Sequence, residues 1–195
     1  MISGPITITE SASIREAIEI MKANSIRHLP VVSKGNKLKG LVTLADLKQG
    51  LIPSMLADVS LTDLMIKNPI IVHPDDDIEI AARIIYKHKI GGMPVVKNDK
   101  LVGIITETDI LRAFIDMMGL LTASSRIDLV LGNEPGQLKK VLQIISDNGG
   151  DIINVGMPVR QTDRRVYYFR LLPCDTKLMR KALEKKGFEV IDATD

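Results

Sequence analysis

The sequence predicts a mixed α/β (α+β) protein, built from two copies of one unit followed by a separate βαββαβ module. Three observations support this class. Residues 4–32 align without a gap with residues 68–96, and residues 37–47 align with residues 100–110. Each copy alternates short β-branched runs with a segment whose apolar residues have helical spacing. From residue 126 onward the repeat stops, and a new succession of strands and helices begins.

Each copy is expected to run strand, helix, strand, turn, strand, helix. The first strand is Ile6–Ile8 in one copy and Ile70–Val72 in the other. Serines within 11–13 and aspartates at 75–77 are suitable N-caps for the helices that follow them. The Pro-Val-Val segments, the polar hairpin turns and the closing apolar strands coincide in the two copies. Because one unit alone buries little apolar surface, we expect the copies to pack around a pseudo-two-fold axis.

The chain is expected to have four parts. These are a first repeat at 1–60, a second repeat at 61–117, a linker at 118–125 and a C-terminal module at 126–195. The module should contain a strand at 126–131, a helix at 137–148, strands at 151–159 and 165–172, a helix at 177–186 and a strand at 188–191. This βαββαβ order is that of a ferredoxin-like module.

Composition and charge exclude several classes of protein. With 45% apolar and 26% charged residues, the chain is neither disordered nor fibrous. The 26 basic and 24 acidic residues nearly balance and aromatics are only 3%, which disfavours a nucleic-acid partner. The single cysteine, Cys174, suits a reducing compartment. We find no apolar run of bilayer length and no secretory signal, so we expect a cytoplasmic protein without a membrane partner.

Motifs for catalysis or metal binding are absent from the sequence. The three histidines, His28, His73 and His88, lack metal-ligand spacing, and no cysteine pair joins them. No phosphate-binding loop, serine-nucleophile elbow or zinc-protease motif is present. The sequence therefore predicts a protein that is not an enzyme, with no metal site and no required cofactor.

One motif occurs once in each copy. GLVTLADL at 40–47 and GIITETDI at 103–110 share the pattern Gly-h-h-Thr-x-x-Asp-h, in which h is apolar. With the Pro-Val-Val strands, this motif makes the repeat resemble a tandem pair of cystathionine-β-synthase (CBS) domains. The segment NEPGQL at 133–138 makes the C-terminal module resemble an ACT domain. The order of the parts is similar to that of bacterial acetoin-utilisation B-type regulatory proteins.

The residues of the repeated motif suit a nucleotide. An aspartate at the start of a helix accepts hydrogen bonds from the two hydroxyls of a ribose, and the helix N-terminus favours its charge. A threonine three residues earlier offers a hydroxyl to the ribose or to the α-phosphate, and free helix N–H groups favour an anion. The same Thr-x-x-Asp pattern is also typical of a helix cap, so Asp46 and Asp109 are alternatively structural.

The resemblance to CBS pairs implies two clefts, each built from both repeats, for an adenosyl ligand such as AMP, ADP, ATP or S-adenosylmethionine. One cleft would use Thr43, Asp46, Ile70, Ile90 and Gly91. The other would use Thr106, Thr108, Asp109, Ile6, Ile26, Arg27 and His28. Basic side chains at 27–28 suit phosphates, whereas the first cleft has glycines there, and Thr108 adds a hydroxyl. We therefore expect the second cleft to bind better.

The resemblance to ACT domains implies dimerisation and a site for a small metabolite at Asn133, Gly136 and Asp151. A purely dimerising role is the alternative, because the acid at Asp151 would repel a ligand carboxylate. The sequence thus predicts a non-catalytic homodimer that senses an adenosyl metabolite and acts on a protein target in carbon or amino-acid metabolism, acetoin utilisation by analogy. A structural module with no working ligand site and a nucleic-acid-binding regulator are the alternatives.

Overall fold

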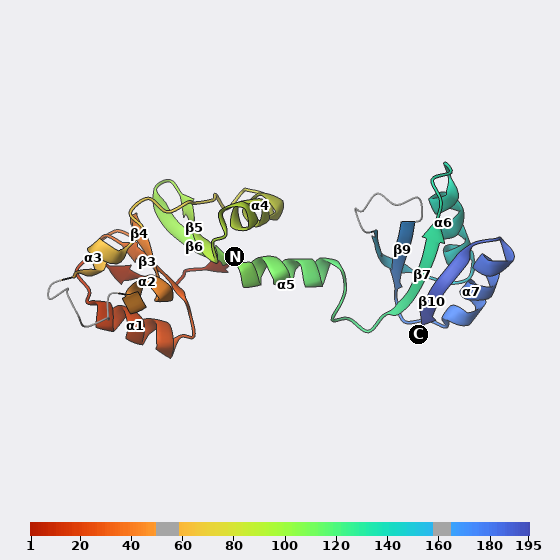
Figure 1. The fold of residues 1–195 in the computed structure, drawn as a ribbon, viewed down its shortest axis with the longest axis horizontal. Helices are drawn as coiled ribbons and strands as arrows, with labels where there is room; N and C mark the ends of the chain where they lie inside the picture. The colour runs from red at the N-terminus through yellow and green to blue at the C-terminus, as the bar shows by residue number, and fades with distance from the viewer. Residues whose placement is uncertain (50–58, 158–164) are drawn as a thin grey trace. The chain divides into compact units, whose positions relative to one another are not determined.

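A computed structural model describes residues 1–49, 59–157 and 165–195 (Figure 1). The chain divides into two compact units, Met1–Leu111 and Arg112–Asp195. The predicted mixed α/β class is confirmed, because each unit combines β-sheet with helices. Among the described residues, no helix has both the length and the apolar character needed to cross a bilayer.

The first repeat forms a three-stranded sheet in the order β2-β3-β4. Its elements are β2 (Ile8–Thr9), α1 (Ile14–Ala23), β3 (His28–Val32), β4 (Leu38–Thr43) and α2 (Leu44–Gln49). Strand β2 is parallel to β3, and β4 is antiparallel to it. The cap of α1 is Ser13, whose hydroxyl accepts a hydrogen bond from the backbone N–H of Glu16 at 3.1 Å. The serine-rich turn therefore starts the helix as the sequence predicts.

The second repeat has the same succession except for its first strand. Its elements are α4 (Ile78–His88), β5 (Gly92–Lys97), β6 (Lys100–Thr106) and α5 (Glu107–Met117), and a short helix, α3 (Leu61–Leu64), precedes them and packs in the core of the first repeat. The strand predicted at Ile70–Val72 is reduced to a single parallel bridge between Val72 and Val95. Pro74 has no N–H with which to continue this ladder. The ring nitrogen Nδ1 of His73 lies 3.0 Å from the carbonyl of Val96, the acceptor that the ladder would use next.

The N-terminal residues of each repeat pair with the last strand of the other repeat. Strand β1 (Ile2–Ser3) is antiparallel to β6, with Ile2 opposite Ile104. In the same way, Ile66 exchanges two backbone hydrogen bonds with Leu41, at 2.8 and 3.0 Å. The two repeats are therefore interlocked by an exchange of short segments, which the sequence analysis did not predict.

The repeats also meet at their hairpin turns. Lys37 and Lys100, which occupy equivalent positions in the two copies, form an isolated antiparallel bridge. Beside it the side-chain amide of Asn36 donates to the carbonyl of Leu101 at 2.7 Å. A bridge between equivalent residues lies on the axis that relates them, so the two copies pack around the expected pseudo-two-fold axis.

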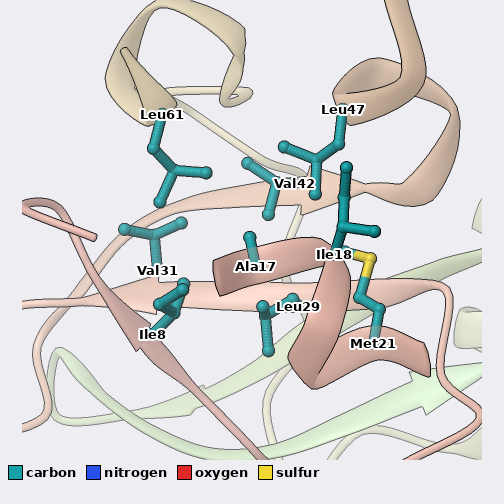
Figure 2. Packing of buried hydrophobic residues seen from close by; sticks show 9 residues of the cluster. All are labelled: Ile8, Ala17, Ile18, Met21, Leu29, Val31, Val42, Leu47 and Leu61. Atoms are coloured by element: carbon teal, nitrogen blue, oxygen red, sulfur yellow. The ribbon is translucent and has the colours of Figure 1, made fainter. Parts of the chain in front are cut away.

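Each repeat has its own apolar core. In the first repeat, side chains from α1, α2, α3 and the strands of the sheet point toward one another (Figure 2). The buried members are Ile8, Ala17, Ile18, Met21, Leu29, Val31, Val42, Leu47 and Leu61. The corresponding core of the second repeat contains Val72, Ala81, Ile85, Met93, Val95, Ile105 and Ile110. These cores hold the start of α2 and the start of α5 in fixed positions.

The C-terminal module is a four-stranded antiparallel sheet in the order β10-β7-β9-β8. Its elements are β7 (Ser125–Leu131), α6 (Gln137–Asp147), β8 (Ile152–Gly156), β9 (Arg165–Leu171), α7 (Thr176–Lys185) and β10 (Glu189–Thr194). This is the βαββαβ order that the sequence predicts. The strand expected over 151–159 ends at Gly156, and the last two positions of that range lie outside the described residues.

The two faces of this sheet differ. Buried residues such as Ile127, Leu129 and Phe169 form a core with side chains of α6 and α7. Because side chains alternate along a strand, the residues between them, such as Asp128 and Tyr168, belong to the opposite face. That second face is rich in polar groups.

Replacing Gly40 by alanine should destabilise the interlocked repeats. A Cβ atom at Gly40 would lie 2.9 Å from the carbonyl oxygen of Ile66 and 2.7 Å from the sulfur of Met65. Since the backbone of Ile66 is held by hydrogen bonds, it cannot give way without strain. We expect the free energy of unfolding, measured by urea denaturation, to fall by about 1–3 kcal/mol. As a control, Gly132→Ala places its Cβ no closer than 3.6 Å to Gln137 and should have a smaller effect; equal effects would contradict the close packing.

Candidate functional site

Each repeat ends its last strand with a threonine and begins the next helix with an aspartate three residues later. The hydroxyl of Thr43 donates to Oδ2 of Asp46 at 2.6 Å, and the Thr43 N–H donates to the same oxygen at 3.1 Å. In return, the N–H of Asp46 donates to the Thr43 hydroxyl at 3.3 Å. Thr106 and Asp109 repeat this arrangement at 2.7, 2.9 and 3.4 Å. Both pairs are therefore reciprocal helix caps.

Capping occupies only part of each carboxylate. In the part of the chain that the structure describes, Oδ1 of Asp46 and Oδ1 of Asp109 have no hydrogen-bond partner. An ionised carboxylate accepts through both oxygens, so each aspartate keeps free acceptor capacity. Both side chains are partly buried. The capping and ligand-binding interpretations of the motif are thus compatible, because they use different oxygens.

A cleft of about 540 Å³, which we call the Thr43 cleft, opens where the two repeats meet at the start of α2. Four of the five residues that the sequence assigns to this site line it: Thr43, Asp46, Ile90 and Gly91. The fifth, Ile70, is not among its lining residues and is 38% exposed. The cleft is also lined by residues that the sequence analysis did not assign to it, which include Arg27, His28, Lys48, Ile66, Lys89 and Glu107.

A smaller cleft of about 250 Å³, the Thr106 cleft, lies at the start of α5. Of the seven residues assigned to it, five line it: Thr106, Thr108, Ile26, Arg27 and His28. Asp109 and Ile6 are not among its lining residues. Arg27 and His28, which the sequence analysis assigned to this cleft alone, line the Thr43 cleft as well.

The two clefts share a wall formed by Arg27, His28, Gly91 and Glu107. A Cβ atom on Gly91 would lie 2.8 Å from the imidazole of His28, so the glycine leaves the space that the ring occupies. Glu107 was missed in the sequence analysis. It directly follows the motif threonine, at the position where the first repeat has Leu44, and a comparison of the two copies at that position would have found it.

His28 is neutral near pH 7. Partial burial lowers the pKa of its imidazole below the ordinary value of 6.5, and the positive charge of Arg27 lowers it further. The carboxylates of Glu107 and Asp46 act in the opposite direction but do not cancel these effects. A neutral imidazole offers one donor and one acceptor in the shared wall.

The structure does not place the three residues expected to form an ACT ligand site in the Thr43 cleft, in the Thr106 cleft or in the groove beside α6. Asn133, Gly136 and Asp151 are all exposed. None of them lines the groove of about 880 Å³ beside α6, although Glu134 and Gln137 do. In the described residues, no group of three or more His, Cys, Asp or Glu side chains is placed to hold a metal ion.

Comparison with known proteins identifies the repeated unit. A family model described as CBS domain matches residues 1–52 and 61–116, which is more than half of the chain. The chain belongs to the CBS-domain family. Its two CBS repeats are the copies recognised in the sequence, and CBS pairs are in general regulatory, non-catalytic modules.

Two curated relatives of this CBS pair are enzymes of greater length. Homoserine O-acetyltransferase from Methanohalobium evestigatum is 38% identical over 113 residues, which are 57% of this chain and 22% of the relative. L-aspartate semialdehyde sulfurtransferase from Methanocaldococcus jannaschii is 35% identical over 111 residues, which are 56% of this chain and 21% of the relative. The chain therefore spans about a fifth of the length of these relatives.

Solved structures similar to this chain include CBS pairs with bound adenosyl compounds. The CBS pair of protein MJ0100, in complex with 5′-methylthioadenosine and S-adenosyl-L-methionine, is 35% identical with a TM-score of 0.52, covering 56% of this chain and 91% of its own. CBSX2 in complex with AMP is 29% identical with a TM-score of 0.53, covering 60% and 92%. The proposed acetoin utilisation protein AcuB from Vibrio cholerae is 36% identical with a TM-score of 0.56, covering 62% and 90%.

The CBS pair should lose stability as the pH falls below about 6.5, because His28 must then take up a proton where burial and Arg27 oppose its charge. The unfolded chain binds this proton more readily, so stability rises with pH up to the unfolded pKa and is then level. We expect the midpoint of urea unfolding to fall between pH 7 and pH 5, and this fall to be smaller in His28→Gln. The exposed His88, changed to Gln, serves as the control and should keep the wild-type profile. A His28→Gln profile equal to that of wild type would contradict this role.

Proposed function

We propose that this protein is a cytoplasmic, non-catalytic regulator whose CBS pair senses an adenosyl metabolite such as AMP, ADP, ATP or S-adenosylmethionine, with the Thr43 cleft as the principal site. The observation that carries the proposal is the carboxylate of Asp46, which lines this cleft with one oxygen still available. The choice of cleft differs from the expectation drawn from the sequence, which favoured the Thr106 cleft.

The lining of the Thr43 cleft suits the three parts of a nucleotide. Asp46 accepts the hydroxyls of the ribose, as an ionised carboxylate does well. Apolar side chains of Leu41, Ile66 and Ile90 provide surfaces for the adenine, which needs no aromatic partner. The cationic side chains of Arg27 and Lys89, on the same lining, favour phosphates or another anionic group.

Size favours the same cleft. Sites for small molecules usually have volumes of roughly 300–1,000 Å³. The Thr43 cleft, at about 540 Å³, lies within this range, and the Thr106 cleft, at about 250 Å³, lies below it. The adenosyl compounds bound by the similar CBS pairs support the class of ligand.

Regulation follows from the position of the cleft at the meeting of the two repeats. A ligand that contacts both repeats favours the arrangement to which it binds more tightly, and it shifts the equilibrium only by that difference in affinity. The C-terminal module, as an ACT domain, dimerises the protein and conveys the change to a protein target. The resemblance to the Vibrio cholerae protein supports a target in carbon metabolism, with acetoin utilisation as the analogy.

Titration calorimetry with AMP, ADP, ATP and S-adenosylmethionine tests the proposal. At least one of them should bind, and Asp46→Asn should weaken it about tenfold or more, because a charged acceptor is lost. Asparagine retains an oxygen that can cap α2, so the melting temperature should change little.

Two further variants separate ligand binding from capping. Asp109→Asn should have the weaker effect, since Asp109 does not line either cleft. Asp63→Asn is the matched control: Asp63 caps α3 through Ser60, at 2.6 and 3.0 Å, and lines neither cleft. If none of the four compounds binds, the proposal fails and the CBS pair is a structural module. If a compound binds and all three variants weaken it equally, the aspartates act only as helix caps and the ligand is held by other residues.

A further inference from the structure

Two arginines lie directly opposite each other on the open face of the C-terminal sheet. The register of β7 and β9 pairs Arg126 with Arg170. Residues that face each other in this way have Cβ atoms about 4.5–5.5 Å apart, and like charges at that spacing destabilise a sheet. The pair therefore has an energetic cost that the fold itself does not require.

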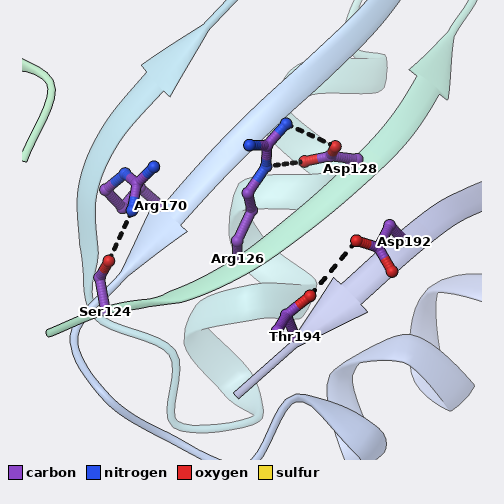
Figure 3. Close-up of polar contacts among 6 residues, drawn as sticks. All are labelled: Ser124, Arg126, Asp128, Arg170, Asp192 and Thr194. Atoms are coloured by element: carbon purple, nitrogen blue, oxygen red, sulfur yellow. Dashed lines mark hydrogen bonds and ion pairs between the residues drawn. The ribbon is translucent and has the colours of Figure 1, made fainter. Parts of the chain in front are cut away.

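One of the two charges is balanced within the module. The guanidinium of Arg126 donates from Nε and Nη2 to the two oxygens of Asp128, at 2.6 and 2.7 Å (Figure 3). It also lies over the ring of Tyr168, 4.8 Å from the centroid. Asp128 is only 8% exposed, whereas the Arg126 side chain is 42% exposed, so the guanidinium is paired with a buried carboxylate and still reaches the surface.

The other charge has no such partner. Nη1 of Arg170 donates to the neutral hydroxyl of Ser124 at 2.6 Å (Figure 3). Among the described residues, no carboxylate forms an ion pair with Arg170. The guanidinium thus keeps a full positive charge and most of its N–H donors for another group.

Both arginines line a pocket of about 270 Å³. Its lining consists of Met118, Leu120, Arg126, Asn154, Gly156, Tyr168, Phe169 and Arg170. The chain that precedes β7 closes one side, since the side-chain amide of Asn154 donates to the carbonyl of Met117 at 3.4 Å. Apolar side chains therefore stand on one side of the pocket and the two guanidinium groups on the sheet.

We infer that this pocket binds a small organic carboxylate whose anionic group bridges Arg126 and Arg170. The planar fork of a guanidinium matches a carboxylate in shape and charge, and an anion between the two arginines removes their repulsion. Met118 and Leu120 contact the carbon part of the ligand, and the pocket's volume restricts that part to a few carbon atoms. The site is separate from both CBS clefts and from Asn133, Gly136 and Asp151.

Calorimetric titration of the full chain with lactate, pyruvate and succinate tests the inference. We expect saturable binding of at least one of the three acids, and a loss of about tenfold or more in affinity in Arg170→Gln. Arg180→Gln removes the same charge from the exposed helix α7, where Arg180 pairs with Glu184, and should leave binding unchanged.

A second measurement asks whether Arg170 is merely structural. Without ligand, Arg170→Gln should melt at the same temperature as wild type or higher, because the like-charge pair is gone. The inference is overturned if none of the three acids binds, if binding persists unchanged in Arg170→Gln, or if that variant melts well below wild type without ligand. Binding of inorganic phosphate in place of all three acids would overturn the choice of an organic carboxylate.

Discussion

The exchange of N-terminal segments between the repeats is the constraint on which the candidate nucleotide site depends. Ile66 is bonded to Leu41 in the first repeat, and Ile2 pairs with Ile104 in the second. These short ladders hold the two sheets at a fixed distance and orientation. Because each cleft takes residues from both repeats, these backbone bonds fix the relative positions of its two walls.

The two repeats share the same backbone arrangement, but the side chains at several equivalent positions near their axis differ. Equivalent backbone hydrogen bonds connect the start of each motif helix to its own repeat. The N–H of Leu44 donates to the carbonyl of Arg27 at 2.9 Å, and the N–H of Glu107 donates to the carbonyl of Gly91 at 3.1 Å. The side chains at these equivalent positions differ completely, an arginine against a glycine and a leucine against a glutamate. The duplicated fold therefore supplies two similar cavities, and a few substitutions near the axis make them unequal in volume and charge.

Much of the fold could be predicted from the sequence, because the two copies of the repeated unit can be aligned with each other. The threonines and aspartates of the motif were located correctly at the starts of α2 and α5, and the βαββαβ order of the module was confirmed. Their placement in a cavity was harder to foresee. Asp109 lines neither cleft although the equivalent Asp46 lines the Thr43 cleft, and neither Ile6 nor its equivalent Ile70 lines either cleft. A motif determines local backbone geometry, whereas the lining of a cleft depends on how two repeats meet.

Three features that the sequence analysis missed have different causes. The loss of a strand at Ile70–Val72 was readable, since Pro74 cannot donate to the ladder, but no such local feature identified the pairing of Ile2 with Ile104. A pairing of two residues against a distant strand has almost no signature in composition or periodicity. The opposed arginines were likewise invisible, because only the register of β7 and β9 brings 126 and 170 together.

The exchanged segments also bear on how the chain reaches its folded state. Ile2 finds its partner about a hundred residues further along the chain, and contacts of such high sequence separation slow folding because a large loop must close first. During synthesis, the amino-terminal strand leaves the ribosome long before β6 exists to receive it. The backbone N–H and C=O groups of β1 that pair with β6 therefore have no partner until the second repeat has been made.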